Sequence, residues 1–353
     1  YSTMEAEPGI AICGSKLVYP DGSLQEAGGI IWNDASGWNY GRLGDPEDPQ
    51  FNYRKDVDYI SGASIMVRRT FWDQAGGFDD VYAPAYYEDT DLAFKARQAG
   101  MRVVYEPRSE VVHFEGISHG TDLESNIKSY QVRNRDIFRE RWQKELAAEH
   151  FPNAQHVFQA RDRSRGKRTM LIIDHYVPHF DRDAGSRSTF QYIKALVDRG
   201  WNVKFIGDNF FAHEPYTEIL QGLGVEVLYG NQMQRTWSGW VRSNADYIDV
   251  VYLFRPHISV KYVDVCREIG AILLYQCVDL HFLRKQREYE LSGKPEDKAR
   301  SDYWRKLEEA MFRKVDTVMT FSSVELDILH ELYPDVQSAQ IPLYALEDLP
   351  PAD

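Results

Sequence analysis

The sequence of 353 residues has little cysteine and no long apolar run. Its three cysteines, Cys13, Cys266 and Cys277, are odd in number and form no Cys-x-x-Cys pair. This usage excludes a disulfide scaffold and a cysteine-type zinc site, and it predicts a reducing, cytoplasmic compartment. No apolar run approaches the roughly 20 residues that a membrane-spanning helix needs. We therefore expect membrane contact to be peripheral at most.

The chain also lacks a basic excess and the glycine-rich nucleotide motifs. Its formal net charge is −13, from 41 basic and 54 acidic residues, whereas a nucleic-acid-binding protein needs a basic face. No Gly-x-Gly-x-x-Gly fingerprint and no P-loop occurs, so the usual NAD and ATP motifs are absent. These absences predict no nucleic-acid partner and count against a nucleotide-dependent oxidoreductase.

What the chain has is enough length and apolar content for two domains. An apolar fraction of 43% and a charged fraction of 27% are ordinary for a folded globular protein. We predict a first domain over residues 1–150, a polar, basic linker over 151–167 and a second domain over 168–353. The chain begins at Tyr1 and ends without a closing element, so we expect a fragment of a longer polypeptide.

The first half mixes short strands, turns and helices. Pro20-Asp21-Gly22 lies between apolar residues and predicts a hairpin, because proline presets φ and glycine accepts a positive φ. Residues 33–56 resemble a long loop. Further strands are expected over 57–60, 64–67, 102–105 and 110–113, and helices over 70–75, 90–98 and 123–149.

The second half alternates strands and helices strictly. Purely apolar strands such as 170–173 and 250–254 are separated by amphipathic segments such as 188–198. This pattern predicts a parallel sheet covered on both faces, which is a Rossmann-like α/β fold. Ligands of such sheets bind beyond the carboxyl ends of the strands and at helix N-termini. The candidate residues there are Asp183, Gly185, Ser186, Asp279 and His281.

An acidic cluster opens the helix expected near residue 90. Glu88, Asp89 and Asp91 face the positive end of the helix dipole. One interpretation is a helix cap, with Asp89 as N-cap and Asp91 favouring the first turn. The other is catalytic, because a carboxylate held ionised there can accept a proton from an incoming hydroxyl.

Two further features flank this cluster. The turn Ser61-Gly62-Ala63 lies between two strands, where it forms either a bulge or a close backbone approach to another group. His113 ends an apolar strand and could bind a divalent ion through a neutral imidazole, although a lone histidine is more often structural. His119 is a weaker second candidate.

Taken together, residues 10–142 resemble the second half of a family-2 glycosyltransferase with the GT-A fold. The resemblance rests on five motifs, which are Lys16–Gly29, Ser61–Arg69, Gly76–Asp80, Tyr86–Arg97 and Val111–Gly116. It implies inverting transfer of a sugar from a nucleotide donor, with Asp89 of the Glu88-Asp89 pair as catalytic base. It also implies that Ser61, Gly62, Ala63 and Asp91 contact substrate. His113 would help to hold a divalent Mn or Mg ion that neutralises the departing diphosphate. The family's Asp-x-Asp half should precede Tyr1.

Residues 168–345 resemble, more loosely, the N-terminal Rossmann domain of a family-4-like GT-B glycosyltransferase. The matching stretches are Asp181–Ser188, Leu196–Gly207, Cys277–Arg284 and Ser322–Leu326. The resemblance implies that the loop 183–186 lies near the donor phosphates and that Asp279 and His281 lie in the cleft.

The sequence thus predicts two incomplete glycosyltransferase modules of a bifunctional enzyme. The expected partners are a nucleotide-sugar donor and a glycan or lipid-linked saccharide acceptor, in the synthesis of a bacterial surface polysaccharide. The alternative is a non-catalytic carbohydrate-binding or scaffolding module.

Overall fold

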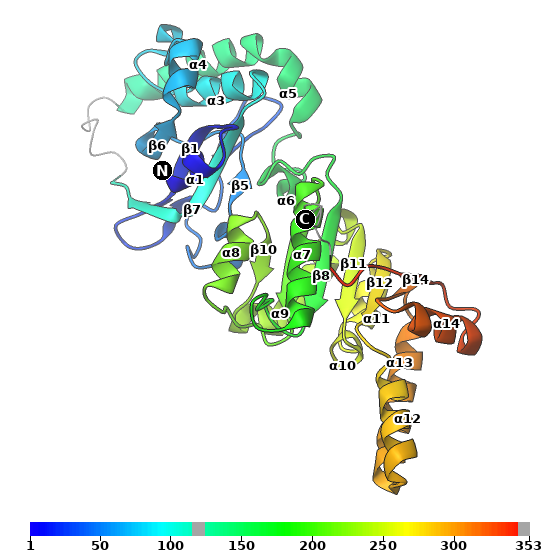
Figure 1. Ribbon diagram of the computed structural model, residues 1–353. Helices are drawn as coiled ribbons and strands as arrows, with labels where there is room; N and C mark the ends of the chain where they lie inside the picture. The colour runs from blue at the N-terminus through cyan, green and yellow to red at the C-terminus, as the bar shows by residue number, and fades with distance from the viewer. Residues whose placement is uncertain (115–123, 345–353) are drawn as a thin grey trace, which may run out of the picture. The chain divides into compact units, whose positions relative to one another are not determined.

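The chain folds into two compact units, Tyr1–Gly166 and Lys167–Asp353, in a computed structural model that describes residues 1–114 and 124–344 (Figure 1). The weaker metal candidate His119 lies outside the described residues. Within the described part of the chain, no helix is long and apolar enough to cross a bilayer.

The first unit is built on a five-stranded mixed sheet. Its strand order is β2-β1-β7-β5, and β6 also pairs with β1. Strands β1 and β7 run parallel, and the other pairs are antiparallel. The strands are β1 (Ile10–Val18), β2 (Leu24–Glu26), β5 (Lys55–Asp56), β6 (Ile65–Val67) and β7 (Arg102–Val112). A separate antiparallel pair is formed by β3 (Gly29–Ile31) and β4 (Gly37–Asn39).

Six α-helices are described in this unit. They are α1 (Ser2–Ala6), α2 (Arg69–Ala75), α3 (Glu88–Gln98), α4 (Glu124–Arg141), α5 (Gln143–Glu149) and α6 (Val157–Ala160). Phe94 of α3 makes edge-on contacts with Phe138 of α4, and its ring centroid lies 5.3 Å from that of Trp142. These buried aromatic rings hold α4 and α5 against α3 and so fix the start of α3.

The sequence-based elements of this unit are mostly confirmed, with four differences, the first being that the loop expected over 33–56 contains β4 and β5. The hairpin at residues 20–22 joins β1 to β2 as expected. The strands expected over 102–105 and 110–113 are one strand, β7, and the long helix expected over 123–149 is interrupted at Trp142. The strand expected over 57–60 is reduced to a bridge between Gly29 and Tyr59, because β5 pairs with β7 just before it.

The expected linker over 151–167 is wrong for most of its length. Phe158 and Ser164 are buried in the first unit, and Arg161 is 5% exposed. Arg163 forms an ion pair with the buried carboxylate of Asp58. The first part of the basic run is therefore packed into the first unit, where Arg163 neutralises acidic groups, whereas Arg165, Lys167 and Arg168 are exposed.

The second unit contains a seven-stranded, fully parallel sheet, which confirms the predicted α/β class. The strand order is β10-β9-β8-β11-β12-β13-β14. The chain moves outward from β8 in one direction and then returns to β11 on its other side, so β8 and β11 flank the switch point of a doubly wound sheet. The strands are β8 (Thr169–Asp174), β9 (Asn202–Gly207), β10 (Glu226–Leu228), β11 (Val250–Phe254), β12 (Ile272–Cys277), β13 (Thr317–Thr320) and β14 (Ser338–Gln340).

Helices connect these strands, as parallel pairing requires. They are α7 (Ala184–Asp198), α8 (Tyr216–Gly222), α9 (Asn231–Ser243), α10 (Pro256–Ser259), α11 (Val263–Glu268), α12 (His281–Ser292), α13 (Pro295–Phe312) and α14 (Ser323–Leu332). Helices α12 and α13 pack against each other as a hairpin that projects from the sheet of this unit (Figure 1).

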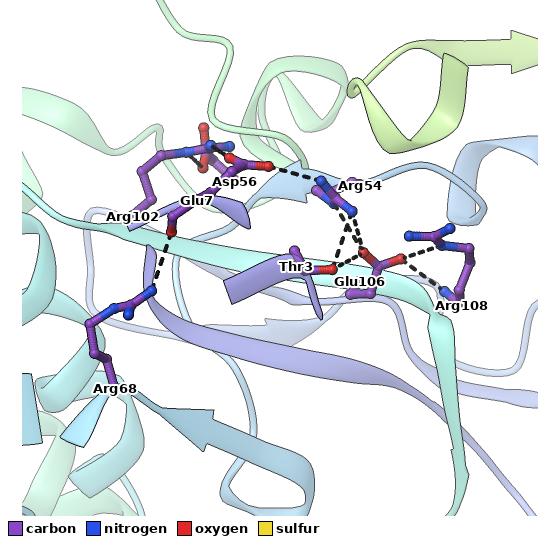
Figure 2. Close-up of polar contacts among 8 residues, drawn as sticks. All are labelled: Thr3, Glu7, Arg54, Asp56, Arg68, Arg102, Glu106 and Arg108. Atoms are coloured by element: carbon purple, nitrogen blue, oxygen red, sulfur yellow. Dashed lines mark hydrogen bonds and ion pairs between the residues drawn. The ribbon is translucent and has the colours of Figure 1, made fainter. Parts of the chain in front are cut away.

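An ion-pair network fastens helix α1 to the sheet of the first unit. Figure 2 shows the Arg54 guanidinium between Glu7 and Glu106, to which it donates at 2.9 and 2.8 Å. Thr3 also donates to the Glu106 carboxylate, at 2.8 Å. Arg54 and Glu106 are largely buried, with 14% and 9% of their side chains exposed, and the second arginine that pairs with Glu106, Arg108, is exposed, so Arg54 is the main compensating charge of Glu106.

We expect Arg54→Ala to destabilise the first unit by about 3 kcal/mol, because it leaves the Glu106 charge buried without its main partner. Urea unfolding followed by exchange of the amides of this unit measures the loss. Arg69→Ala is the matched control, because Arg69 forms an exposed pair with Asp73 and its loss should change stability little. Equal effects of the two substitutions would contradict the importance of the network.

Candidate active site

Helix α3 begins two residues earlier than an aspartate cap at Asp89 would place it. Glu88 is its first residue, and Tyr87 occupies the N-cap position with a left-handed φ of 74° and no side-chain cap. Tyr86 also has a positive φ, of 76°. Two consecutive non-glycine residues in this region cost about 1–2 kcal/mol each. The interpretation of Asp89 as an N-cap is therefore wrong, and the strained turn places its carboxylate elsewhere.

The Asp89 carboxylate meets the Ser61–Ala63 turn, so the structure brings together two features that the sequence singled out separately. Its Oδ2 accepts a hydrogen bond from the backbone N–H of Gly62 at 2.9 Å. Its Oδ1 accepts from the backbone N–H of Thr90 at 2.6 Å and from the Thr90 hydroxyl at 3.1 Å. Asp89 remains partly exposed, so it is both held in place and accessible.

The turn itself is a short 3₁₀ helix, η2 (Gly62–Ser64), capped by Ser61. The Ser61 hydroxyl accepts from the N–H of Ala63 at 3.3 Å. A Cβ on Gly62 would lie 3.7 Å from Asp89 Oδ2, an ordinary contact. Gly62 therefore contributes its backbone N–H to the site, and the space around it does not require a glycine.

Glu26 is a site residue that the sequence analysis missed. It lies at the end of β2 with 2% of its surface exposed, and its Oε1 accepts from the N–H of Ser61 at 3.4 Å. Burial, together with the nearby charge of Asp89, raises the pKa of Glu26 to about 8. Its position in the Lys16–Gly29 motif was the available signal, but only the fold brings β2 next to α3.

Like Glu26, the carboxyl groups of Asp89 and Glu88 have raised pKa values. Burial raises the pKa of Asp89 despite the hydrogen bonds from Gly62 and Thr90. Burial and the Asp89 charge raise the pKa of Glu88. Tyr59 lies beside them, and burial and the charges of Glu26 and Asp89 raise its pKa well above 10. Carboxylates whose charge is disfavoured in this way are suited to accepting protons near neutral pH.

The expected contact between Asp91 and substrate is not supported by the structure. Its carboxylate is 1% exposed and accepts from Tyr82 at 3.1 Å, Arg141 at 3.0 Å and Trp142 at 2.8 Å. Lys95 pairs with its second oxygen at 2.9 Å. The side chain is enclosed by α3, the end of α4 and the segment around Tyr82, so it anchors the helix and is not available to a ligand.

His113 follows β7 and contacts Gln25, with 3.1 Å between its Nδ1 and the amide oxygen. In residues 1–114 and 124–344, no group of three or more histidine, cysteine, aspartate or glutamate side chains could hold a metal ion. The described residues therefore do not form a divalent-metal site around His113.

In the second unit, an ion pair marks the switch point of the sheet. Asp174 at the end of β8 accepts from the Arg255 guanidinium at 2.9 Å and from Thr189 at 3.1 Å. Arg255 follows β11 and has a left-handed φ of 64°. A Cβ on Gly185 would lie 3.3 Å from the Arg255 guanidinium. The sequence analysis missed Arg255, because nothing in its local sequence marks it.

The predicted loop 183–186 forms the start of α7 at this edge. Asp183 is the N-cap and accepts from the Ser186 N–H and hydroxyl, both at 2.7 Å. These bonds lower the pKa of Asp183 although burial opposes them. Gly185 lines a cavity of about 480 Å³ together with Val278, Arg287 and Phe321, beyond the carboxyl ends of β12 and β13. Asp183 and Ser186 thus shape the loop, and Gly185 lies on the cavity wall.

His281 is not the cleft residue that was expected. It is 9% exposed, and its ring stacks on Trp304 with centroids 4.5 Å apart. The backbone N–H of His281 donates to the buried Glu308 carboxylate at 2.9 Å, and Glu308 also accepts from the backbone N–H of Phe282. His281 and Glu308 therefore secure the start of α12. Asp279 is partly exposed and pairs with Arg284 at 2.9 Å.

Comparison with known proteins gives partial matches, and no family model matches the chain. An N-acetylglucosaminyl-diphospho-decaprenol L-rhamnosyltransferase of Mycobacterium tuberculosis is 38% identical over 76 residues, which are 22% of this chain and 24% of that protein. The O-antigen biosynthesis protein RfbC of Myxococcus xanthus is 26% identical over 122 residues, which are 33% of this chain and 9% of that protein. The chain thus spans a quarter or less of the length of these relatives. Their names agree with the resemblance found in the sequence.

Among solved structures, sucrose-phosphate synthase from Thermosynechococcus elongatus is 14% identical and covers 50% of this chain and 48% of its own, with a TM-score of 0.37. A TM-score of this size does not establish a shared fold, so the fold class rests on the two sheets described above.

We expect Asp91→Asn to lower the stability of the first unit by about 2–4 kcal/mol, because Lys95 and Arg141 lose their buried counter-charge. Thermal unfolding measures the effect. Asp73→Asn, which alters an exposed aspartate with one arginine partner, is the control and should leave the melting temperature nearly unchanged. A neutral result for Asp91→Asn would contradict its role as an anchor.

Proposed function

We propose that the first unit is the acceptor side of an inverting glycosyltransferase and that Asp89 is its catalytic base. The observation that carries the proposal is the fixed, partly exposed Asp89 carboxylate, bound to Gly62 and Thr90 at the start of α3. Its raised pKa makes it a better proton acceptor than an ordinary aspartate. The relatives named as a rhamnosyltransferase and an O-antigen biosynthesis protein support this class of reaction.

The proposed reaction is a single displacement. The acceptor hydroxyl gives its proton to Asp89 as its oxygen forms a bond to the anomeric carbon of the donor sugar. The bond from that carbon to the diphosphate breaks, and the electron pair leaves with the nucleoside diphosphate. The donor is a nucleotide sugar and the acceptor a glycan or lipid-linked saccharide. No step is assigned to a metal ion, because the described residues provide no set of ligands for one.

Two residues of the cluster have supporting roles in this proposal. Glu88 adds a partly buried carboxyl group next to the base, and the Ser61-Gly62-Ala63 turn orients the base through its amides. The proposed sugar transfer would take place in the cytoplasm, with at most peripheral membrane contact.

The second unit is proposed to be the N-terminal domain of a GT-B-type glycosyltransferase. The support is its parallel sheet, the switch-point pair of Asp174 and Arg255, and the cavity beside Gly185. The loop 183–186 would face the donor phosphates, with Arg287 supplying positive charge from the cavity wall. Together the two units would form part of a bifunctional polysaccharide-building enzyme.

Asp89→Asn should lower the turnover number by about 10²- to 10⁴-fold, the usual contribution of a general base. Release of nucleoside diphosphate from a panel of UDP-, GDP- and dTDP-sugars, in the protein at its natural length, measures it. The wild-type rate should rise with pH through the raised pKa of Asp89, since only the ionised form accepts a proton. The exposed Asp73→Asn variant is the control.

Equal rates in Asp89→Asn and wild type would remove Asp89 as the base. Retained binding of glycans by a wild-type protein that transfers no sugar would favour a non-catalytic carbohydrate-binding module.

Arg287→Ala should weaken binding of UDP, GDP or dTDP by about 10-fold, as expected for one lost charge-assisted contact. Isothermal calorimetry measures the affinity. Arg284→Ala is the matched control, because Arg284 lies on the same helix but pairs with Asp279. The same affinity in both variants would contradict phosphate binding at the cavity.

A further inference from the structure

Two carboxyl groups from distant parts of the chain bind consecutive backbone amides of one turn. Glu26 of β2 accepts from the N–H of Ser61, and Asp89 of α3 accepts from the N–H of Gly62. The two carboxyl groups are near enough for the charge of Asp89 to act on Glu26. Two like charges at such a separation inside a protein are costly, so one group of such a pair retains a proton.

The hydrogen bonds distinguish the two groups. Asp89 accepts three bonds, from Gly62, Thr90 N–H and the Thr90 hydroxyl, and donors of this kind stabilise an ionised carboxylate. Glu26 accepts one long bond at 3.4 Å. Its other oxygen, Oε2, is buried and has no hydrogen-bond partner among the described residues. The charge is therefore stabilised on Asp89 and not on Glu26.

The surroundings offer Glu26 no compensating charge. The titratable groups that interact with Glu26 are Asp89 at the start of α3 and the phenols of Tyr59 and Tyr105. Within the described residues, no lysine or arginine figures among the groups that act on Glu26 or Glu88. An ionised Glu26 would thus be a buried, uncompensated anion.

We infer that Glu26 is a positioning residue that holds the single proton of the Glu26–Asp89 pair, so that Asp89 is the ionised member. The part of this inference that concerns catalysis rests on the proposed function. Glu26 keeps the pair at one negative charge, which leaves Asp89 ready to accept a proton and limits repulsion of an anionic diphosphate donor.

The pH dependence follows from the direction of the shift. The pKa of Glu26 is raised from 4.5 to about 8. The folded state therefore holds this proton more tightly than the unfolded state, and the stability gained from it is complete below pH 4.5 and is lost as pH rises toward 8. Above pH 8 a second anion appears beside Asp89, and sugar transfer should slow.

Carboxyl ¹³C NMR of this chain with labelled glutamate locates the proton without relying on activity. We expect one glutamate carboxyl to titrate near pH 8, to vanish in Glu26→Gln and to titrate at lower pH in Asp89→Asn. The exposed Glu5→Gln variant should retain this titration. The Glu88→Gln variant distinguishes the signal of Glu26 from that of Glu88, whose pKa is also raised. A Glu26 carboxyl already ionised at pH 6, or one unaffected by Asp89→Asn, would overturn the inference.

Activity and stability provide the second measurement. Relative to Glu26→Gln, wild type should lose melting temperature between pH 5 and 8, and its rate should show an alkaline fall near pH 8 that the variant lacks. An unchanged alkaline fall in the variant would overturn the catalytic part of the inference. A wild-type protein without transferase activity would instead refute the proposed function, and the NMR titration would still decide which carboxyl holds the proton.

Discussion

Burial of the Asp91 carboxylate fixes the geometry on which the candidate site depends. Tyr82, Arg141, Trp142 and Lys95 all bind it, and they come from three separate segments. Helix α3 is thereby held against α4 and α5. Since Asp89 lies two residues before Asp91, its carboxylate is placed on the opposite side of the first turn, where it meets the amide of Gly62.

The backbone of the turn before α3 is strained in this arrangement. Tyr86 and Tyr87 both adopt left-handed backbone conformations, and Asn134 of α4 compensates by donating to the carbonyls of Tyr82, Ala85 and Tyr86 at 2.7 to 3.1 Å. Strained backbone next to partly buried carboxyl groups is typical of sites where position matters more than stability. In the second unit, the loop 183–186 is an ordinary, well-capped helix start, and Arg255 is the residue of the switch point with a positive φ.

The acidic cluster shows how residues of one motif acquire different roles. Glu88, Asp89 and Asp91 are close in sequence, yet a helix turns about 100° per residue, so they face different neighbours. Asp91 faces the interior and is fully paired, Asp89 faces the Ser61–Ala63 turn, and Glu88 is partly buried beside it. Glu26 joins them from β2, and this neighbour sets the electrostatics of the cluster.

The sequence by itself determined the local patterns: the α/β class, the parallel sheet of the second half, the hairpin at residues 20–22, and the Ser61–Ala63 and Glu88–Asp91 motifs as places of interest. Apolar periodicity and turn chemistry act over a few residues, so they can be seen without the fold. Only the tertiary structure decided that Asp91 and His281 are anchors, that residues 151–166 pack into the first unit, and that Glu26 and Arg255 belong to the candidate sites. Those roles depend on burial and on partners that are mostly distant in the chain, such as Arg163 and Asp58, which are 105 positions apart, and no local pattern records such contacts.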